Sequence, residues 1–285
     1  MTNRRMRWSR MGLALGLVCM LLVTACGDDD DNAPTPAGSR ADAPAGLEGN
    51  LTVFAAASLT DAFGLVKQIL EDANPDLTIE YNFAGSQALA TQLGEGAEAD
   101  VFASANKTQM AAAQDADRID GEPVIFVRNR LAIIVPKDNP AGITEPADLA
   151  NEGVKLVVAN PDVPVGGYTL DTLDKMSADP TFGADFRTKV GANIVSMESN
   201  VKQVVTKVQL GEADAGVVYV SDVTPDVRES VAFIEIPEEF NVIAEYPIAA
   251  VSDGDSDLAQ AFIDFLLSAG GQEALAEWGF TPVNQ

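Results

Sequence analysis

Short apolar segments of β-strand type alternate with amphipathic helical segments from Leu51 to the end of the chain. This alternation is typical of α/β proteins, in which helices connect the strands of mostly parallel sheets. The clearest helix is predicted over Ser199–Leu210, where valines spaced i, i+3, i+4 and i+7 share one face. The expected strands are Leu51–Phe54, Leu77–Tyr81, Val101–Ala103, Leu131–Val135, Lys155–Ala159, Ala215–Val218, Val231–Ile236 and Ala244–Val251.

Two of these strands have a further predicted role. Leu131–Val135 and Ala244–Val251 are expected to carry the chain from one lobe to a second and back. Near the C-terminus, Ser256 and Asp257 are typical of a helix cap, and Gly270-Gly271 is expected to end the helix that follows.

The first 25 residues are typical of a secretory signal, because four arginines precede an uncharged apolar run over Met11–Val23. That run is too short to span a bilayer comfortably. It ends in Val23-Thr24-Ala25-Cys26, which resembles the lipobox of bacterial lipoproteins. We predict a signal peptide over 1–25, a lipid anchor on Cys26 and a disordered acidic, proline-containing linker over 26–49. The mature protein would then lie outside the cytoplasm, anchored to the cell membrane; the alternative is a cleaved signal with an incidental cysteine.

Histidine is absent and cysteine occurs only twice, which removes several classes of site. The chain cannot build a Ser-His-Asp or Cys-His catalytic group, a histidine-ligated zinc or iron site, or a Cys₄ site. With 43 acidic against 18 basic residues, the formal net charge is −25, which argues against a nucleic-acid partner.

Four predicted helices begin with small or polar residues, three of them shortly after a predicted strand. Ser58 and Ser86 lie at two of these starts, and the other two are formed by 163–167, before a helix expected near Tyr168, and by 198–201. Unpaired backbone N–H groups at the positive end of a helix dipole bind oxyanions. Any one of these starts is explained equally well by ordinary helix capping, so only their combination favours a binding site.

The sequence resembles the molybdate-binding proteins of bacterial ABC uptake systems from about Leu51 to Thr281. The strongest pair of matching motifs is Ala55-Ala56-Ala57-Ser58-Leu59 with Val218-Tyr219-Val220-Ser221-Asp222. The other matching segments are Phe83-Ala84-Gly85-Ser86, Ala99-Asp100-Val101-Phe102-Ala103-Ser104-Ala105-Asn106, Asn160-Pro161, Val163-Pro164-Val165-Gly166, Asn200-Val201, Glu245-Tyr246-Pro247-Ile248 and Gly279-Phe280-Thr281.

The resemblance implies a two-lobed, flytrap-like periplasmic-binding-protein fold of type II, with lobe 1 over 50–129 and 246–285 and lobe 2 over 130–245. It also implies a tetrahedral oxyanion, molybdate or tungstate, held by neutral hydrogen-bond donors. The implied donors are the hydroxyl and N–H groups of Ser58 and Ser86, the N–H groups of Ala105, Val165 and Val201, and the Tyr219 phenol.

The same resemblance implies a monomeric binding protein that has no enzymatic activity and no cofactor and that delivers its ligand to a membrane permease. Molybdenum would bind as its oxyanion, and no site for a bare metal cation is expected. Two positions depart from the family pattern: Gly85 replaces a common serine, and Val165 replaces the more common alanine. These departures place the fit of the ligand in question.

Three other functions remain open from the sequence. A protein of the same fold could bind another oxyanion such as sulfate or phosphate. A secreted hydrolase could use a pair of carboxylates, although aromatic residues make up only 6% of the chain. A scaffolding lipoprotein without a ligand would also be consistent with the lipid anchor, the linker and the acidic composition.

Overall fold

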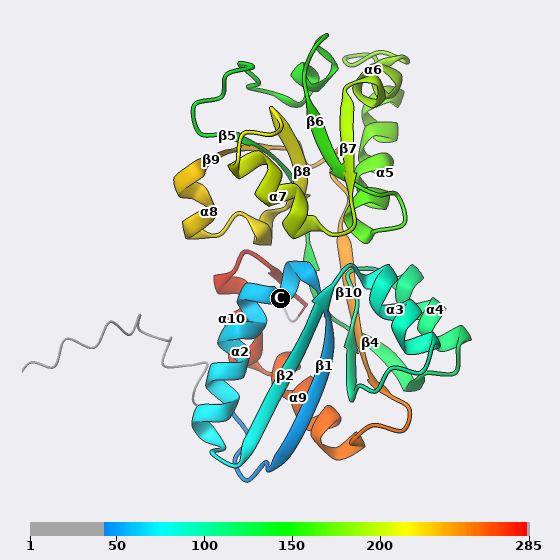
Figure 1. The fold of residues 1–285 in the computed structure, drawn as a ribbon, viewed down its shortest axis with the longest axis vertical. Helices are drawn as coiled ribbons and strands as arrows, with labels where there is room; N and C mark the ends of the chain where they lie inside the picture. Colours follow the sequence, from blue (N-terminus) through cyan, green and yellow to red (C-terminus); the bar gives the residue numbers. More distant parts are fainter. Residues whose placement is uncertain (1–42, 284–285) are drawn as a thin grey trace, which may run out of the picture. The chain divides into compact units, whose positions relative to one another are not determined.

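Two mixed β-sheets form the centres of two lobes in residues 43–283, the part of the chain that the computed structural model describes (Figure 1). The strand order is β11-β4-β10-β3-β1-β2 in lobe 1 and β7-β6-β8-β5-β9 in lobe 2. The strands of lobe 1 are β1 (Gly49–Ala56), β2 (Leu77–Ala84), β3 (Val101–Ala103), β4 (Ile119–Asn129), β10 (Ala244–Val251) and β11 (Thr281–Pro282). The strands of lobe 2 are β5 (Leu131–Pro136), β6 (Leu156–Ala159), β7 (Ile194–Glu198), β8 (Ala215–Tyr219) and β9 (Val231–Glu235).

Helices cover both sheets. Those of lobe 1 are α2 (Thr60–Ala73), α3 (Ser86–Gly94), α4 (Lys107–Asp115), α9 (Ser256–Leu267) and α10 (Ala269–Glu277), with the 3₁₀ turn η1 (Ala57–Leu59) before α2. Those of lobe 2 are α5 (Pro164–Ala178), α6 (Phe186–Ala192), α7 (Val201–Gln209) and α8 (Pro225–Ser230), with the 3₁₀ turns η2 (Pro146–Ala150) and η3 (Val220–Asp222). Among the helices of residues 43–283, none has both the length and the apolar character needed to cross a bilayer.

The predicted two-lobed α/β fold class is confirmed, but the sheets are mixed rather than mostly parallel. Strand β1 runs parallel to β2 and β3, and β6 runs parallel to β7 and β8. The remaining pairings, including β10 with β4 and β5 with β8, are antiparallel. The reason is the path of the chain: β4 leaves lobe 1 and β10 re-enters it, so the two strands run in opposite directions.

The chain crosses between the lobes twice. The first crossing is at Arg130, between β4 and β5, and the second lies in 236–243, between β9 and β10. Asn241 joins the two crossings, because its side chain accepts a hydrogen bond from Leu131 N (3.0 Å) and donates one to Leu131 O (2.9 Å). The predicted hinge strands, β5 and β10, therefore each begin directly after a crossing.

The helix α7 packs its predicted valine face against the lobe 2 sheet. Val201, Val204, Val205 and Val208 are all buried. Gly216 on β8 allows this close approach, since a Cβ at that position would lie 2.9 Å from the side chains of Val204 and Val208. The prediction of this helix from periodicity is confirmed.

The prediction that Gly270-Gly271 ends the last helix is wrong. Helix α9 ends at Leu267, and the Ser268 side chain caps a further helix, α10, by accepting a hydrogen bond from Gly271 N at 3.1 Å. A Cβ on Gly271 would lie 2.0 Å from Phe265 O. This glycine therefore serves close backbone packing between two helices rather than helix termination.

The predicted linker is too long at its C-terminal end. Strand β1 begins at Gly49, Asn74 Oδ1 accepts a hydrogen bond from Leu47 N (2.9 Å), and Asn74 Nδ2 donates to Pro44 O (2.8 Å). Residues 43–48 are thus held against the folded part of lobe 1. The predicted signal peptide, Cys26 and the linker up to 42 lie outside the described residues.

Candidate functional site

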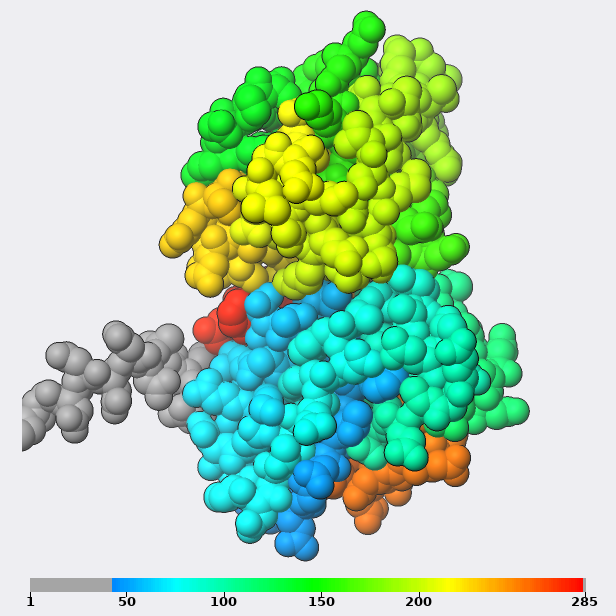
Figure 2. Space-filling model, viewed as in Figure 1, coloured from blue at the N-terminus to red at the C-terminus, as the bar shows by residue number. Residues whose placement is uncertain are grey.

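A small cavity of about 10 Å³, which is room for little more than one water molecule, lies where the helix starts of the two lobes meet. In the space-filling view the lobes touch along a narrow seam (Figure 2). The cavity is lined by Ala56, Ala57, Ser58, Ala84, Gly85, Ser86, Ala105, Val163, Pro164, Val165, Asn200, Val201 and Tyr219. All six residues predicted from the sequence therefore lie together, although they come from segments far apart in the chain.

In lobe 1, the site is formed where strands β1 and β2 end. Ser58 lies in η1, between β1 and α2, and Ser86 is the first residue of α3, directly after β2 and Gly85. The two strands are parallel neighbours, with Ala55 opposite Phe83 and Ala56 opposite Ala84, so their carboxyl ends bring both serines to one edge of the sheet. Both side chains are buried.

In lobe 2, two helix N-termini face the cavity. Helix α5 begins at Pro164, four residues before the predicted start near Tyr168, because proline suits the first helical position. Asn200 caps α7 by accepting a hydrogen bond from Gln203 N at 3.1 Å, which leaves Val201 as the first helical residue. The N–H groups of Val165 and Val201 lie in first turns, so they have no acceptor within their own helices.

Ala105 has a different contact from the one predicted. Its N–H donates to Ser86 Oγ at 3.0 Å, so it is already engaged within lobe 1. Because the Ser86 oxygen accepts this bond, its own hydrogen is directed elsewhere and can be donated into the cavity. Ala105 is therefore better described as a residue that orients Ser86 than as a direct donor.

A second hydroxyl network orients Ser58. Ser58 Oγ lies 2.9 Å from Tyr246 Oη, and Asn129 Nδ2 approaches the same phenol at 3.5 Å and donates to Ser221 Oγ at 2.8 Å. When Tyr246 donates to Ser58, the Ser58 hydrogen is free for a ligand. Tyr246 is not among the site residues predicted from the sequence, although it lies in one of the matching motifs, because its role depends on contacts with distant parts of the chain.

The hydroxyl group of Tyr219 indicates most directly what kind of ligand the cavity could hold. The residue is 1% exposed, and among the described residues no group meets its hydroxyl at hydrogen-bonding geometry, although the Tyr246 phenol is near enough to add to the rise that burial causes in its pKa. Burial raises the pKa of this phenol well above its ordinary value, so it remains a neutral donor. A buried polar group without a partner costs free energy, and such groups are rare in folded proteins. A hydrogen-bond acceptor placed in the cavity would satisfy it.

The cavity lining contains no charged side chain. Its polar groups are hydroxyls, a capping amide and backbone N–H groups. A carboxylate-based hydrolase therefore gains no support from this site, since a general acid and base would have to lie against the substrate. In the part of the chain that the structure describes, no cluster of three or more histidine, cysteine or acidic side chains is arranged to hold a metal ion.

A larger neighbouring groove is less suited to an anion. Its volume is about 330 Å³, and Asp162, Asp171 and Glu245 contribute to its wall. Lys107 in this groove is paired with Glu245 at 2.5 Å. The acidic groups would repel an oxyanion there, so the small cavity of neutral donors is the better candidate.

Known proteins are similar to this chain over the residues that form the two lobes. The family model described as bacterial extracellular solute-binding protein matches residues 51–281. The molybdate-binding protein ModA of Mycobacterium tuberculosis is 38% identical over 279 residues, covering 96% of this chain and 99% of that protein. The solved substrate-binding domain of a putative molybdenum ABC transporter from Clostridium difficile is 27% identical, with a TM-score of 0.61, and covers 82% of this chain and 99% of that chain.

The fold is shared more widely. The sulfate-binding protein SubI from Mycobacterium tuberculosis superimposes with a TM-score of 0.75 at 18% identity, over 83% of this chain and 88% of that chain. The match to the family model includes both lobes and every residue of the cavity. The chain belongs to the family of bacterial extracellular solute-binding proteins.

Proposed function

We propose that this protein is a monomeric, extracytoplasmic binding protein that captures molybdate, and with it tungstate, and delivers the oxyanion to an ABC permease. The observation that carries the proposal is the buried, unpartnered Tyr219 hydroxyl in a cavity lined only by neutral groups. Relatives named for molybdate binding support the choice of ligand.

Capture requires the lobes to separate. Ser58, Ser86, Val165, Val201 and Tyr219 are each at most 3% exposed, so an anion can reach them only when the cavity opens. The hydroxyls of Ser58 and Ser86 then offer donors from lobe 1. The N–H groups of Val165 and Val201 and the Tyr219 phenol offer donors from lobe 2. An oxyanion that accepts from both lobes binds the closed form better than the open one and so shifts the population toward closure.

Neutral donors are sufficient for tight binding. Each hydrogen bond to a charged acceptor contributes roughly 1.5–3 kcal/mol, so five to seven such bonds supply about 8–20 kcal/mol. Association costs about 4–15 kcal/mol in lost freedom of motion. The difference is compatible with micromolar or tighter binding.

Selectivity follows from the size and protonation of the ligand. Donors fixed on rigid helix starts are set for one oxygen-to-oxygen distance, so the smaller sulfate ion would have longer hydrogen bonds. Molybdate and tungstate, which have nearly the same size, would not be separated. Hydrogen phosphate carries an O–H that finds no free acceptor in a shell of donors, which disfavours it.

Molybdate and tungstate are expected to raise the melting temperature of the purified protein, and sulfate and phosphate are expected to change it little. At a ligand concentration about 100 times the dissociation constant, binding adds about 2.7 kcal/mol of stability. For a folded part of this size, this corresponds to roughly 5–10 °C. A thermal-shift assay with the four anions measures the effect, and calorimetry gives the affinities.

The Ser86→Ala variant tests whether the ligand binds in this cavity. Loss of one hydroxyl donor is expected to weaken molybdate binding about 10-fold or more, from roughly 1.5–3 kcal/mol, while the unliganded protein still folds. Sulfate binding as tightly as molybdate would contradict the choice of ligand. Full molybdate affinity in the Ser86→Ala variant would show that the site is elsewhere.

We also propose that Cys26 carries a lipid anchor. The support is the sequence Val23-Thr24-Ala25-Cys26 at the end of an apolar run. The Cys26→Ser variant, expressed in a bacterial host that processes lipoproteins, is expected to leave the membrane fraction and appear in the soluble extracytoplasmic fraction. Mass spectrometry of the wild-type N-terminus should show an acylated cysteine. An unmodified Cys26 in membrane-extracted protein would overturn this proposal.

A further inference from the structure

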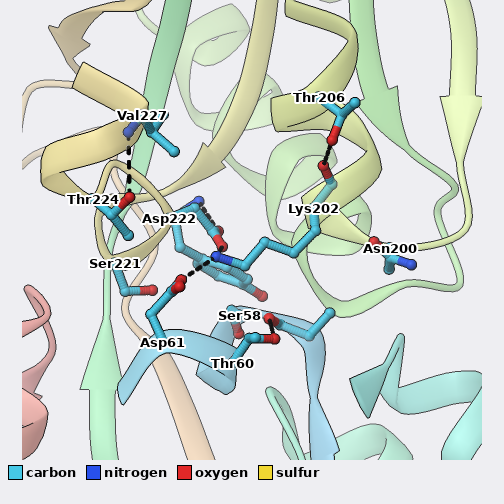
Figure 3. A network of polar contacts seen from close by, with 12 residues as sticks. Ser58, Thr60, Asp61, Asn200, Lys202, Thr206, Ser221, Asp222, Thr224 and Val227 are labelled. Carbon is cyan, nitrogen blue, oxygen red and sulfur yellow. Dashed lines mark hydrogen bonds and ion pairs between the residues drawn. The ribbon is translucent and has the colours of Figure 1, made fainter. Parts of the chain in front are cut away.

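The side chain of Lys202 connects the two lobes beside the cavity (Figure 3). Lys202 is the second residue of α7 in lobe 2, and its Nζ lies 2.6 Å from Asp61 Oδ2 on α2 in lobe 1. The same Nζ lies 3.2 Å from Asp222 Oδ1 in η3, which belongs to lobe 2. Figure 3 shows the ammonium group between the two carboxylates.

The two carboxylates differ in what happens to them when the lobes separate. Asp222 is wholly buried, and its Oδ2 accepts a hydrogen bond from Tyr219 N at 3.1 Å, so it moves with lobe 2 and with Lys202. Asp61 belongs to lobe 1 and is about one-third exposed. Opening the lobes therefore breaks the pair with Asp61 and leaves the pair with Asp222 intact.

Lys202 is positively charged in the closed form. Burial acts to lower the pKa of Lys202, but Asp222 and Asp61 outweigh it and raise the pKa overall. Lys202 in turn compensates the buried Asp222 carboxylate, whose pKa burial raises. An uncompensated carboxylate here would be unfavourable both for folding and for an anion in the neighbouring cavity.

The ion pair is positioned at the edge of the proposed ligand site. Lys202 directly follows Val201, and Asp61 is three residues after Ser58, so each partner is attached to a segment that lines the cavity. Two neutral hydrogen bonds also join the lobes around it, from Gln87 Nε2 to Ser199 O (2.9 Å) and from Gln109 Nε2 to Asp162 O (3.1 Å). Lys202 and Asp61 supply a charged contact between the same two halves of the site.

We propose that the Lys202–Asp61 ion pair is a latch that holds the lobes closed over the bound oxyanion and thereby sets how slowly the ligand is released. This inference rests on the proposed function and deepens it. Lys202 acts as a positioning residue, because it holds the start of α7, with Val201, against lobe 1. Since the pair is partly exposed, dissolved salt screens it, and ligand release should become faster as ionic strength rises.

The test is rapid-mixing kinetics of molybdate binding and release by the full protein at low and at high salt. Asp61→Asn is expected to raise the release rate about 2- to 5-fold, as for loss of one partly exposed ion pair. The association rate should stay within about twofold, since the pair holds the unliganded lobes together only part of the time, whereas it is always formed in the closed, ligand-bound protein. The salt dependence of the release rate should be lost in this variant.

Two further variants separate a latch from a general structural effect. Asp257→Asn removes a carboxylate from the first turn of another lobe 1 helix, α9, and should release molybdate at the wild-type rate. Lys202→Arg keeps the positive charge, so this variant should retain the slow, salt-dependent release of the wild type. Wild-type release kinetics in Asp61→Asn, or equal effects of Asp61→Asn and Asp257→Asn, would overturn the proposal.

Failure of the proposed function would be recognised separately. If the wild-type protein does not bind molybdate, small-angle X-ray scattering of the unliganded proteins still tests the latch. Asp61→Asn should then have a larger radius of gyration than both the wild type and Asp257→Asn at low salt. Identical scattering of the three proteins would exclude a latch, whatever the ligand is.

Discussion

Gly166→Ala is expected to reduce both the stability of the protein and its affinity for molybdate. A Cβ at Gly166 would lie 2.1 Å from Asn160 O, 2.6 Å from Ala159 O and 2.7 Å from Asn160 C. All three contacts are with backbone atoms, which cannot rotate away as a side chain can. The start of α5 would have to move by about 1 Å or more to restore normal contact. Overpacking of this kind costs about 1–3 kcal/mol of unfolding free energy.

The same displacement moves the N–H of Val165, which is the residue before Gly166. A hydrogen bond stretched by this amount is largely lost, so we expect molybdate affinity to fall about 10- to 100-fold. Calorimetric titration and urea-induced unfolding measure the two effects.

Gly167→Ala is the matched control for this prediction. It lies on the same helix, one residue further on, and its Cβ would meet Pro161 O at 3.4 Å, an ordinary contact distance. Alanine also favours a helix more than glycine does. We expect the Gly167→Ala variant to be as stable as the wild type and to bind molybdate normally. Equal behaviour of the two alanine variants would mean that the close approach at Gly166 has no energetic importance.

Removal of the Tyr219 and Tyr246 hydroxyls should have opposite effects on the free protein. In Tyr219→Phe, we expect the affinity for molybdate to fall about 10- to 100-fold, because one charge-assisted hydrogen bond is lost. The unliganded protein should not lose stability, because the Tyr219 hydroxyl has no partner among the described residues. Closure of the unliganded lobes should even become easier in Tyr219→Phe, because closure of this variant no longer buries an unpaired hydroxyl.

Tyr246→Phe makes the same chemical change on a neighbouring ring, whose centroid lies 5.8 Å from that of Tyr219. Here the hydroxyl contacts Ser58 and Asn129, so its removal leaves buried partners unsatisfied. We expect the unfolding free energy of this variant to fall by about 1–3 kcal/mol. Parallel calorimetry and chemical unfolding of both variants provide the comparison. A stability loss in Tyr219→Phe equal to that in Tyr246→Phe would contradict a free Tyr219 donor.

Regular, buried elements could be predicted closely from the sequence. The strands at Val101–Ala103 and Ala244–Val251 have the predicted bounds, because mainly apolar segments that polar or turn residues follow give a local signal. Strand β4 was not predicted, since its first half contains Asp120, Gly121 and Glu122 and is exposed. Strand β7 was not predicted either, because Val195 and Met197 point to solvent on an edge strand and do not form a continuous apolar run.

The positions of the candidate site residues could also be predicted, but their contacts could not. Ser58, Ser86 and the segments 163–167 and 198–201 could be identified because helix starts leave a local mark in the sequence, and the family resemblance pointed to Val165 and Val201 within those segments. Nothing local indicates that the N–H of Ala105 is taken by Ser86, 19 residues away, or that Ser58 contacts Tyr246, 188 residues away.

The sequence by itself determined the α/β alternation, the absence of histidine chemistry and the small, neutral residues at the helix starts. These features depend on composition and on neighbours a few positions apart. The tertiary structure decided which donors are free and which are engaged, and it brought Lys202 to Asp61 across 141 positions of the sequence. Contacts of this kind form only when distant segments return to the same place, and local periodicity carries no information about where they meet.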